Sequence, residues 1–383
     1  MFQDRPRIRL WSIAALAGAG IVAVLLTQGA QPAARAEEPP AASKMVVPDL
    51  LELPAASSVR ATHSLQLAVA RAGNRLVSVG ENGIVLLSDD NGNTWQQASS
   101  VPVSVTLTDV TFANAEQGWA VGHSGVILHT GDGGDTWQLQ IDGNGAAQKV
   151  ADEAAALAAA GALNADAAVR NGQYMISDGP DKPFLAVHFA DENKGWVVGA
   201  YGLALMTTDG GTSWSSITAR IPNPGGKHLY RIDEAGTQLV IAGEQGALFH
   251  SRDGSATFEK VESPYEGTFF GLIGLTDGGV LAYGLKGNAW RADADMTQWR
   301  QIDLGQPVTV TAGTHLADGS IVLGDEGGRL LRSADDGESF THAGTPGSAG
   351  LTGVTQADDG ALIISGTRGN VRVAASSLAV ETR

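Results

Sequence analysis

The stretch Gly118-Trp119-Ala120-Val121-Gly122-His123-Ser124-Gly125 is a short apolar strand that ends in a Gly-x-x-Gly turn, and it decides the fold. The same unit occurs seven times, with its glycine pairs at Gly80-Gly83, Gly122-Gly125, Gly199-Gly202, Gly243-Gly246, Gly284-Gly287, Gly324-Gly327 and Gly366-Gly369. Successive first glycines are separated by 42, 77, 44, 41, 40 and 42 residues. A fixed period near 40 is typical of a four-stranded propeller blade. We therefore predict an all-β fold, a seven-bladed β-propeller over residues 61–376.

A second motif follows most of these turns, with a hydroxyl residue, Asp, Gly, a second hydroxyl residue and an aromatic residue at fixed spacing. Complete copies cover residues 88–95, 130–137, 207–214 and 333–340, whereas the copy at 251–258 lacks the glycine. This motif is the Asp-box, or BNR repeat. Its carboxylate can accept hydrogen bonds from a hairpin turn, and its aromatic ring can wedge between sheets. We therefore expect structural roles for Asp90, Asp132, Asp209, Asp253, Asp335, Trp95, Trp137 and Trp214.

The step of 77 residues is one period plus about 35 inserted residues, which places an insertion at 142–182, between blades two and three. Its Ala-rich stretch Ala146–Ala160 favours a helix that ends at Gly161. A second short helix is predicted to start at Asn164 and to stop before Asn171. Loops between blades leave on the same face as the turns between strands two and three, so this helical insertion should share that face with the Gly-x-x-Gly turns.

The first 36 residues resemble an export signal. Arg5, Arg7 and Arg9 precede the apolar run Leu10–Leu26, and Ala34-Arg35-Ala36 fits a cleavage site. Either a cleaved signal peptide or a retained membrane anchor fits this pattern, and both predict an exported propeller. The sequence contains no cysteine, which excludes disulfides and a lipid-modified cysteine within it. We therefore expect a periplasmic protein, soluble or tethered to the inner membrane through residues 1–36.

Residues 37–60 form a Pro- and Ala-rich linker that becomes extended near Met45–Leu53. Blade seven has three clear strands, so its fourth strand must come from elsewhere. We expect Met45–Leu53 to supply it and to close the ring, with Leu378–Glu381 as the alternative. Closure matters because an unpaired edge strand is a template for aggregation.

The charge of the exported part is strongly negative. Residues 1–36 contain four arginines and one aspartate, which leaves 21 basic and 40 acidic residues and a net charge of −19. This balance argues against nucleic acid and anionic lipid as partners of the folded part. Any membrane contact would then depend on the N-terminal segment remaining uncleaved.

The repeat unit resembles that of the photosystem II stability/assembly factor family. The resemblance is carried by Asp109-Val110-Thr111-Phe112, Gly118-Trp119-Ala120-Val121-Gly122 and the following Asp-box, and residues 187–214 repeat it closely. It covers about residues 60–375 and implies an exported, non-enzymatic, seven-bladed propeller that helps to assemble a membrane protein complex. The arginine patch described for photosynthetic members cannot be aligned here residue by residue, and the helical insertion is not part of the common repeat.

The rival hypothesis is a glycan-binding or glycan-hydrolysing propeller, since sialidases also carry Asp-boxes. Arg220-Ile221-Pro222 matches the Arg-Ile-Pro motif of sialidases, but it follows the third box instead of preceding the first. We expect no enzyme, no catalytic residue and no cofactor. His123 and His129 do not have the spacing of metal ligands, and the carboxylates of the boxes are already committed to turns.

What remains is a recognition surface on the face that carries the Gly-x-x-Gly turns. Each turn presents two residues between its glycines, and an exposed aromatic residue at such a tip is a typical interface anchor. We predict a partner-binding face that includes His123, Tyr201, Glu244, Lys286, Asp325 and Arg368. The expected partner is an envelope or inner-membrane protein complex.

Overall fold

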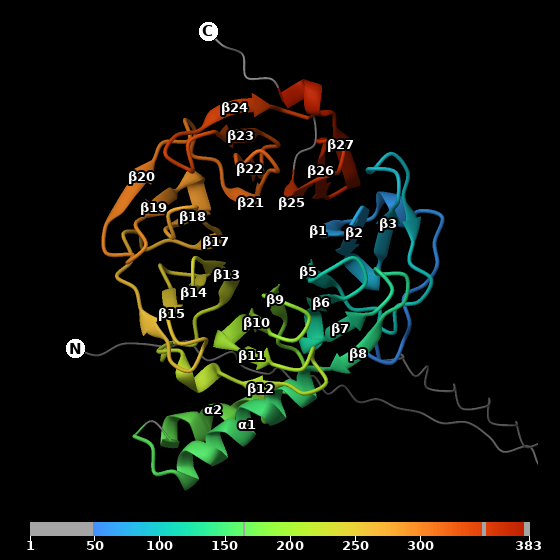
Figure 1. Cartoon of the computed structure of the whole chain (residues 1–383). Helices are drawn as coiled ribbons and strands as arrows, with labels where there is room; N and C mark the ends of the chain where they lie inside the picture. The colour runs from blue at the N-terminus through green and yellow to red at the C-terminus, as the bar shows by residue number, and fades with distance from the viewer. Residues whose placement is uncertain (1–48, 164, 347–349, 379–383) are drawn as a thin grey trace, which may run out of the picture. The chain divides into compact units, whose positions relative to one another are not determined.

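The computed structural model describes residues 49–163, 165–346 and 350–378, which form seven antiparallel sheets around a central channel (Figure 1). Each sheet is one blade, whose strands lie side by side in chain order from the channel outward. The innermost strands contact one another all round the ring, including the first against the last. The predicted seven-bladed fold is confirmed, while the predicted export segment lies outside the described residues.

Six blades have four strands and blade seven has three among the described residues. Blade one contains β1 (Gln66–Ala72), β2 (Arg75–Gly80), β3 (Val85–Ser88) and β4 (Gln96–Gln97); blade two β5 (Leu107–Phe112), β6 (Gly118–Gly122), β7 (Ile127–Thr130) and β8 (Gln138–Ile141); blade three β9 (Phe184–Phe189), β10 (Gly195–Gly199), β11 (Ala204–Thr207) and β12 (Ser215–Ser216); blade four β13 (Leu229–Ala235), β14 (Gln238–Gly243), β15 (Leu248–Ser251) and β16 (Glu259–Lys260). Blade five contains β17 (Phe269–Gly274), β18 (Val280–Gly284), β19 (Ala289–Ala292) and β20 (Trp299–Ile302); blade six β21 (Val310–His315), β22 (Ile321–Asp325), β23 (Leu330–Ser333) and β24 (Thr341–Gly344); blade seven β25 (Leu351–Gln356), β26 (Leu362–Gly366) and β27 (Gly369–Val373).

The core lies between neighbouring blades, and strand β14 shows why the central strands are apolar throughout. Leu239 and Ile241 pack into the cluster shared with blade three, whereas Val240 and Ala242 pack into the cluster shared with blade five. Because successive side chains of a strand point to opposite faces, a strand sandwiched between two sheets must be apolar at every position. Alternating polar residues there would be buried without partners.

Two tryptophans of the Gly-Trp element connect one blade to the Asp-box of the next. The Trp119 ring stacks on Phe189 with 3.5 Å between ring centroids, and its Nε1–H donates to the Gly210 carbonyl at 3.1 Å. Trp196 repeats this arrangement one blade later, donating to Ser255 Oγ at 3.0 Å. Both indoles are fully buried. The Gly-Trp element is therefore an inter-blade contact.

The insertion consists of two packed helices, α1 (Gly143–Ala159) and α2 (Ala165–Asp178), which lie beside blade three (Figure 1). Asp142 caps α1 by accepting a hydrogen bond from the Gly145 N–H at 2.8 Å. The predicted end of the second helix before Asn171 is wrong. The helix continues because Gly172 allows close packing: a Cβ there would lie only 2.9 Å from the Ala151 Cα.

The insertion is packed against the propeller. Ala146, Val150 and Met175 are buried in one cluster with residues of blades two and three, namely Val121, Ile127, Phe184, Val197, Leu203 and Leu205. This contact supplies the apolar burial that an Ala-rich hairpin lacks by itself. Among the described residues, no helix is long and apolar enough to cross a membrane.

The predicted closing strand at Met45–Leu53 lies only in part within the described residues, because residues 45–48 are outside them. Residues 49–53 contain a turn and no strand, and the backbone on either side of Pro54 bonds to the loop between blades one and two (Ser104 N to Leu50 O, 2.9 Å; Ala55 N to Val101 O, 3.0 Å). Pro54 lacks the N–H that a ladder strand would need. A short 3-10 helix covers Ala375–Leu378, and the other residues of the alternative strand at Leu378–Glu381, 379–381, lie outside the described residues. Blade seven is joined to blade one by Thr352, whose hydroxyl donates to the Gln66 carbonyl at 2.7 Å.

Candidate partner-binding face

The Gly-x-x-Gly turns share one backbone geometry in blades one to five. The second residue of each turn is left-handed and is not glycine, with φ between 51° and 57° at Asn82, Ser124, Tyr201, Gln245 and Lys286. A left-handed conformation costs a residue with a Cβ about 1 kcal/mol or more. Residues in such unfavourable backbone conformations are found most often at functional sites. The residues at these turn tips are therefore candidates for contact with a partner.

In blades one to five, the first glycine of the turn is required by close packing against the innermost strand. A Cβ on Gly122 would lie 2.3 Å from the Thr106 carbonyl oxygen, and one on Gly199 would lie 2.2 Å from that of Pro183. No side chain fits at such distances. This explains why the motif marks the blades so regularly along the sequence.

The six predicted face residues differ in their surroundings. His123, Tyr201, Lys286 and Arg368 are exposed. Glu244 is half-buried and accepts a hydrogen bond from the His228 N–H at 2.8 Å. All five therefore lie at turn positions that leave at least part of the side chain accessible.

Asp325 is not accessible, so the prediction that it belongs to the partner-binding face is wrong. Its side chain is fully buried and pairs with Arg329 at 2.7 Å (Asp325 Oδ2 to Arg329 Nε). The cause is a turn shifted by one residue, since Asp325 pairs with Val310 where the other blades place the first glycine. The carboxylate also accepts from the Arg329 N–H and so holds the turn itself.

Tyr201 is the most prominent residue of this face, with 51% of its surface exposed. Its backbone N–H donates to His228 Nδ1 at 2.9 Å, and the two rings meet edge to face with 4.9 Å between centroids. Lys182 Nζ lies 5.6 Å from the Tyr201 ring centroid and 5.8 Å from that of Tyr174 on α2. The insertion and the blade-three turn are thus joined at one point, which confirms that they share a face.

Lys182 is held in place by two carboxylates, Asp178 at 2.8 Å and Asp181 at 2.9 Å. Burial alone would lower the pKa of Lys182, but these two partners outweigh it and raise the pKa above its ordinary value. The ammonium group of Lys182 is therefore charged, is neutralised by Asp178 and Asp181, and lies beside the rings of Tyr174 and Tyr201.

A groove of about 470 Å³ opens between the insertion and blade three. One wall is made by Val150 of α1 with Ala167, Ala168 and Asn171 of α2. The other is the loop from Thr218 to Gly226, and Tyr201 stands at the edge between them. A cleft of this size with a mainly apolar lining is typical of a binding site.

Glu153 lies at the side of the groove and fixes the loop. Its carboxylate accepts from Ser216 Oγ at 2.6 Å and from the Ala219 N–H at 3.2 Å, and Arg220 Nε lies 3.7 Å away. Burial raises the pKa of Glu153 above its usual range, against these hydrogen bonds and the Arg220 charge. Arg220, the arginine of the Arg-Ile-Pro stretch, also donates to the Ser255 carbonyl and so joins the loop to blade four.

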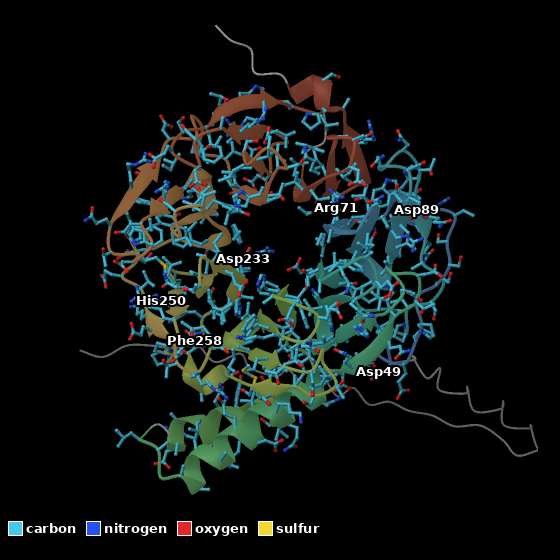
Figure 2. The ribbon with its side chains drawn as sticks, in the orientation of Figure 1. Asp49, Arg71, Asp89, Asp233, His250 and Phe258 are labelled. Atoms are coloured by element: carbon cyan, nitrogen blue, oxygen red, sulfur yellow. The ribbon has the colours of Figure 1, made fainter. Side chains whose placement is uncertain are left out.

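The central channel is polar, and its charges compensate one another. Arg231 lies 3.1 Å from Asp233 and 3.6 Å from Asp109, which also accepts from the Val187 N–H. Burial raises the pKa of Asp109 and brings that of Tyr283 to about 12. Asp233 and Arg71 lie on opposite sides of the opening, and Arg71 pairs with Asp358 (Figure 2).

The Asp-boxes form hairpin turns with a shared hydrogen-bond pattern. In the second box, Asp132 accepts from the Thr136 N–H at 2.9 Å, from Thr136 Oγ1 at 2.6 Å and from Thr130 Oγ1 at 2.8 Å. Asp90, Asp209, Asp253 and Asp335 do the same in their own turns. Trp137 and Trp214 are buried, and Trp95 is half-buried. Among the described residues, no group of three or more His, Asp or Glu side chains is arranged to hold a metal ion.

Sequence reasoning missed the residues that join this face to the channel. His228 and Tyr230 have centroids 6.5 Å apart, and Tyr230 meets Phe270 edge to face at 5.2 Å. A signal was present, since Tyr230 and Phe270 each follow the first buried residue of an innermost strand. This signal becomes visible only when the seven repeats are aligned on their innermost strands instead of on their glycines.

Comparisons with known proteins agree with the repeat. The family model described as "Photosynthesis system II assembly factor YCF48" matches residues 97–155 and 170–266. A curated relative, the "Photosystem II assembly lipoprotein Ycf48" of Synechococcus sp. (strain CC9902), is 34% identical over 77 residues, 20% of this chain. The matched part spans 23% of that relative's length.

Solved structures resemble the chain over most of its length. A structure of YCF48 bound to D1 peptide has a TM-score of 0.58 at 16% identity, covering 82% of this chain and 94% of that one. YCF48 from Cyanidioschyzon merolae gives 0.59 at 14% identity over 82% and 97% of the two chains. The WD40 propeller domain of Doa1 gives 0.58 at 14% identity over 86% and 99%, so these likenesses establish the fold alone. The sequence matches lie in its central blades, which are similar to those of photosystem II assembly factors.

Proposed function

We propose that this chain is an exported, non-catalytic propeller that binds a protein partner and serves as an assembly or accessory factor for an envelope membrane complex. The carrying observation is the groove between the helical insertion and the blade-three turn, with Tyr201 at its edge. The relatives support the class of activity, because they are assembly factors and one is described as bound to a D1 peptide. The partner of this chain would likewise be a membrane protein subunit.

Export through residues 1–36 is part of the same proposal. The Synechococcus relative is described as a lipoprotein, whereas the present sequence contains no cysteine. Attachment of this chain to a membrane would therefore use the apolar run Leu10–Leu26 if it is retained. The expected compartment is the periplasm.

The proposal is tested by filling the groove without disturbing the fold. Ala167 is exposed on the groove wall, so Ala167→Arg adds a long charged side chain there while keeping a strong helix former. Ala158→Arg is the matched control, since Ala158 is exposed on α1 and does not line the groove. Crosslinking pull-downs from cells should recover subunits of a membrane complex with the wild type and the control.

The Ala167→Arg variant should lose those subunits at an unchanged melting temperature. If both variants recover the membrane subunits equally well, the groove is not the element that recognises the partner. Recovery of polysaccharide in place of a membrane subunit would favour the glycan-binding alternative.

A further inference from the structure

Every innermost strand carries a β-bulge at the same position. The register shifts by one residue near the turn face in each blade, at Leu67, Thr108, Leu185, Tyr230, Phe270, Thr311 and Thr352. All seven bulge residues line the channel. Bulges re-aim a side chain, and here they turn one residue per blade toward the mouth of the channel.

In blades two, six and seven the bulge residue is a threonine with a structural task. Thr108 Oγ1 donates to the Phe184 carbonyl at 2.7 Å, Thr311 Oγ1 to that of Leu351 at 2.6 Å, and Thr352 Oγ1 to that of Gln66 at 2.7 Å. Each bond connects one innermost strand to the next blade. A threonine at the bulge therefore stabilises the contact between neighbouring blades.

Blade one, with Leu67 at the bulge, and blades three, four and five lack this bond. Blades three, four and five place Leu185, Tyr230 and Phe270 at the bulge, and within the described residues no side-chain hydroxyl reaches the equivalent carbonyls of Leu229, Phe269 and Val310. The three side chains are half-buried at the channel mouth. Three consecutive blades have exchanged an inter-blade hydrogen bond for partly exposed apolar surface.

These side chains continue the groove described above. Starting from Tyr201 at the groove edge, the ring centroids are 4.9 Å apart to His228, 6.5 Å to Tyr230 and 5.2 Å to Phe270. Strands β9, β13 and β17, which carry the bulges, are neighbours around the opening (Figure 1). We call Tyr201, His228, Tyr230, Phe270 and Leu185 the apolar track. It leads from the insertion to the mouth of the channel.

Most charges beside the track have a partner within the chain. Lys182 pairs with Asp178 and Asp181, Glu153 lies beside Arg220, and Glu244 lies 4.0 Å from His228 Nδ1. Lys227 Nζ donates to the Gln245 carbonyl, which orients the ammonium group without neutralising it. Of these groups only Lys227 keeps a charge without an opposite partner, so the track offers a ligand little charge to pair with, while the chain's net charge of −16 repels an acidic one. Alternate side chains of an extended peptide are about 6.8 Å apart. This matches the 6.5 Å between the His228 and Tyr230 rings and exceeds the other two ring spacings of the track.

We propose that the apolar track binds an extended, uncharged segment of a partner polypeptide, with apolar side chains between the rings and a length of about five residues. This inference rests on the proposed function and specifies the part of the partner that is recognised. Apolar contacts supply the affinity, and the groove receives the continuation of the segment beside α2.

The test restores the residue that the other blades carry. The double variant Tyr230→Thr, Phe270→Thr removes two rings of the track and supplies hydroxyls positioned for the carbonyls of Phe269 and Val310. It should melt no lower than the wild type, which separates loss of binding from loss of fold. Lys260→Ala is the control, because Lys260 is exposed on β16, the outermost strand of blade four, and belongs neither to the track nor to the turn face.

The probe is a random dodecapeptide library displayed on phage and selected against the immobilised full-length chain. Selected peptides should be rich in apolar residues, and their affinity should change less than about twofold between low and high salt. The double variant should bind them at least about tenfold more weakly, and Lys260→Ala should bind them like the wild type.

Charged, salt-sensitive peptides, or binding to the double variant within about twofold of the wild type, would overturn the inference. The proposed function is tested independently of the track by the crosslinking pull-down described above. If the double variant still recovers the same membrane subunit from cells as the wild type, the track is refuted and the assembly role remains. If apolar peptides are selected but no membrane subunit is recovered, the track is supported and the assembly role is lost.

Discussion

Replacing Asp132 isolates the contribution of one Asp-box turn. Asp132→Ala removes a carboxylate that accepts from the Thr136 N–H, from Thr136 Oγ1 and from Thr130 Oγ1. Asp132→Asn keeps the size of the side chain and can keep one oxygen for the Thr136 N–H. The two variants therefore remove different numbers of hydrogen bonds from the same turn.

The magnitude follows from these bonds and from their exposure. Each hydrogen bond contributes about 1 kcal/mol net, and water replaces part of it because Thr136 is exposed. Asp132→Ala should lower the free energy of unfolding by about 1–3 kcal/mol, and Asp132→Asn by about 1 kcal/mol. Urea denaturation at a constant m-value measures both differences.

The effect should depend on pH in a defined direction. Burial would raise the pKa of Asp132, but the hydrogen bonds from Thr136 and Thr130 outweigh it, so the pKa is lowered in the folded state. A lowered pKa contributes stability that is complete above the unfolded value of about 3.9 and is lost as the pH falls through the folded value. The gap between wild type and Asp132→Asn should be constant between pH 5 and 8 and should close in stronger acid.

Partner recovery by the folded fraction should be unchanged in both variants. If the unfolding curves coincide with that of the wild type while the partner is lost, the box is a binding site and the structural assignment is wrong. A gap that widens in acid would contradict the hydrogen-bond explanation.

Three further predictions concern the insertion, the turn tip and catalysis. Replacing Gly145–Asp178 with a short Gly/Ser loop should lower the melting temperature, because it uncovers Val121 and Phe184, now packed against α1 and α2; an unchanged melt would indicate a loosely held insertion. Tyr201→Gly should raise the free energy of unfolding, measured by urea denaturation, by up to about 1 kcal/mol, because it relieves a left-handed φ of 57°. The same variant should bind the partner more weakly, as measured by peptide anisotropy. A lower free energy of unfolding would contradict the prediction about stability. The purified chain should hydrolyse neither sialosides nor aryl glycosides above the buffer rate, and turnover abolished by Arg220→Ala would overturn the non-catalytic assignment.

The blades could be located from the sequence because their glycines are sterically compelled. Gly122 and Gly199 face carbonyl oxygens at distances that no Cβ tolerates, so the repeat cannot vary there. In blade six the turn is shifted by one residue, and Asp325 fills the equivalent place in the ladder. The spacing Gly324-x-x-Gly327 is the same as in the other blades, so no local pattern indicates that Asp325 is buried.

The ends and the binding face were harder to predict, because both depend on contacts between distant residues. The chain at Leu50–Ala55 prefers the loop at Val101–Ser104 to an edge of blade seven, which local pattern cannot reveal. The second helix continues through Asn171-Gly172 because Ala151 of the other helix is close enough to need a glycine. Tyr201 was predicted from its turn, whereas Phe270 acquires its role only when four rings come together across three blades.

The two indole contacts between blades have an evolutionary consequence. Repeat three carries both a donor, Trp196, and an Asp-box turn that receives the Trp119 donor of the preceding repeat. A duplicated copy of such a unit would find its upstream and downstream contacts already encoded. Gene duplication could therefore add a blade without inventing an interface, and later divergence would be free to act on the turn tips and the bulge positions, where neighbouring blades already differ most.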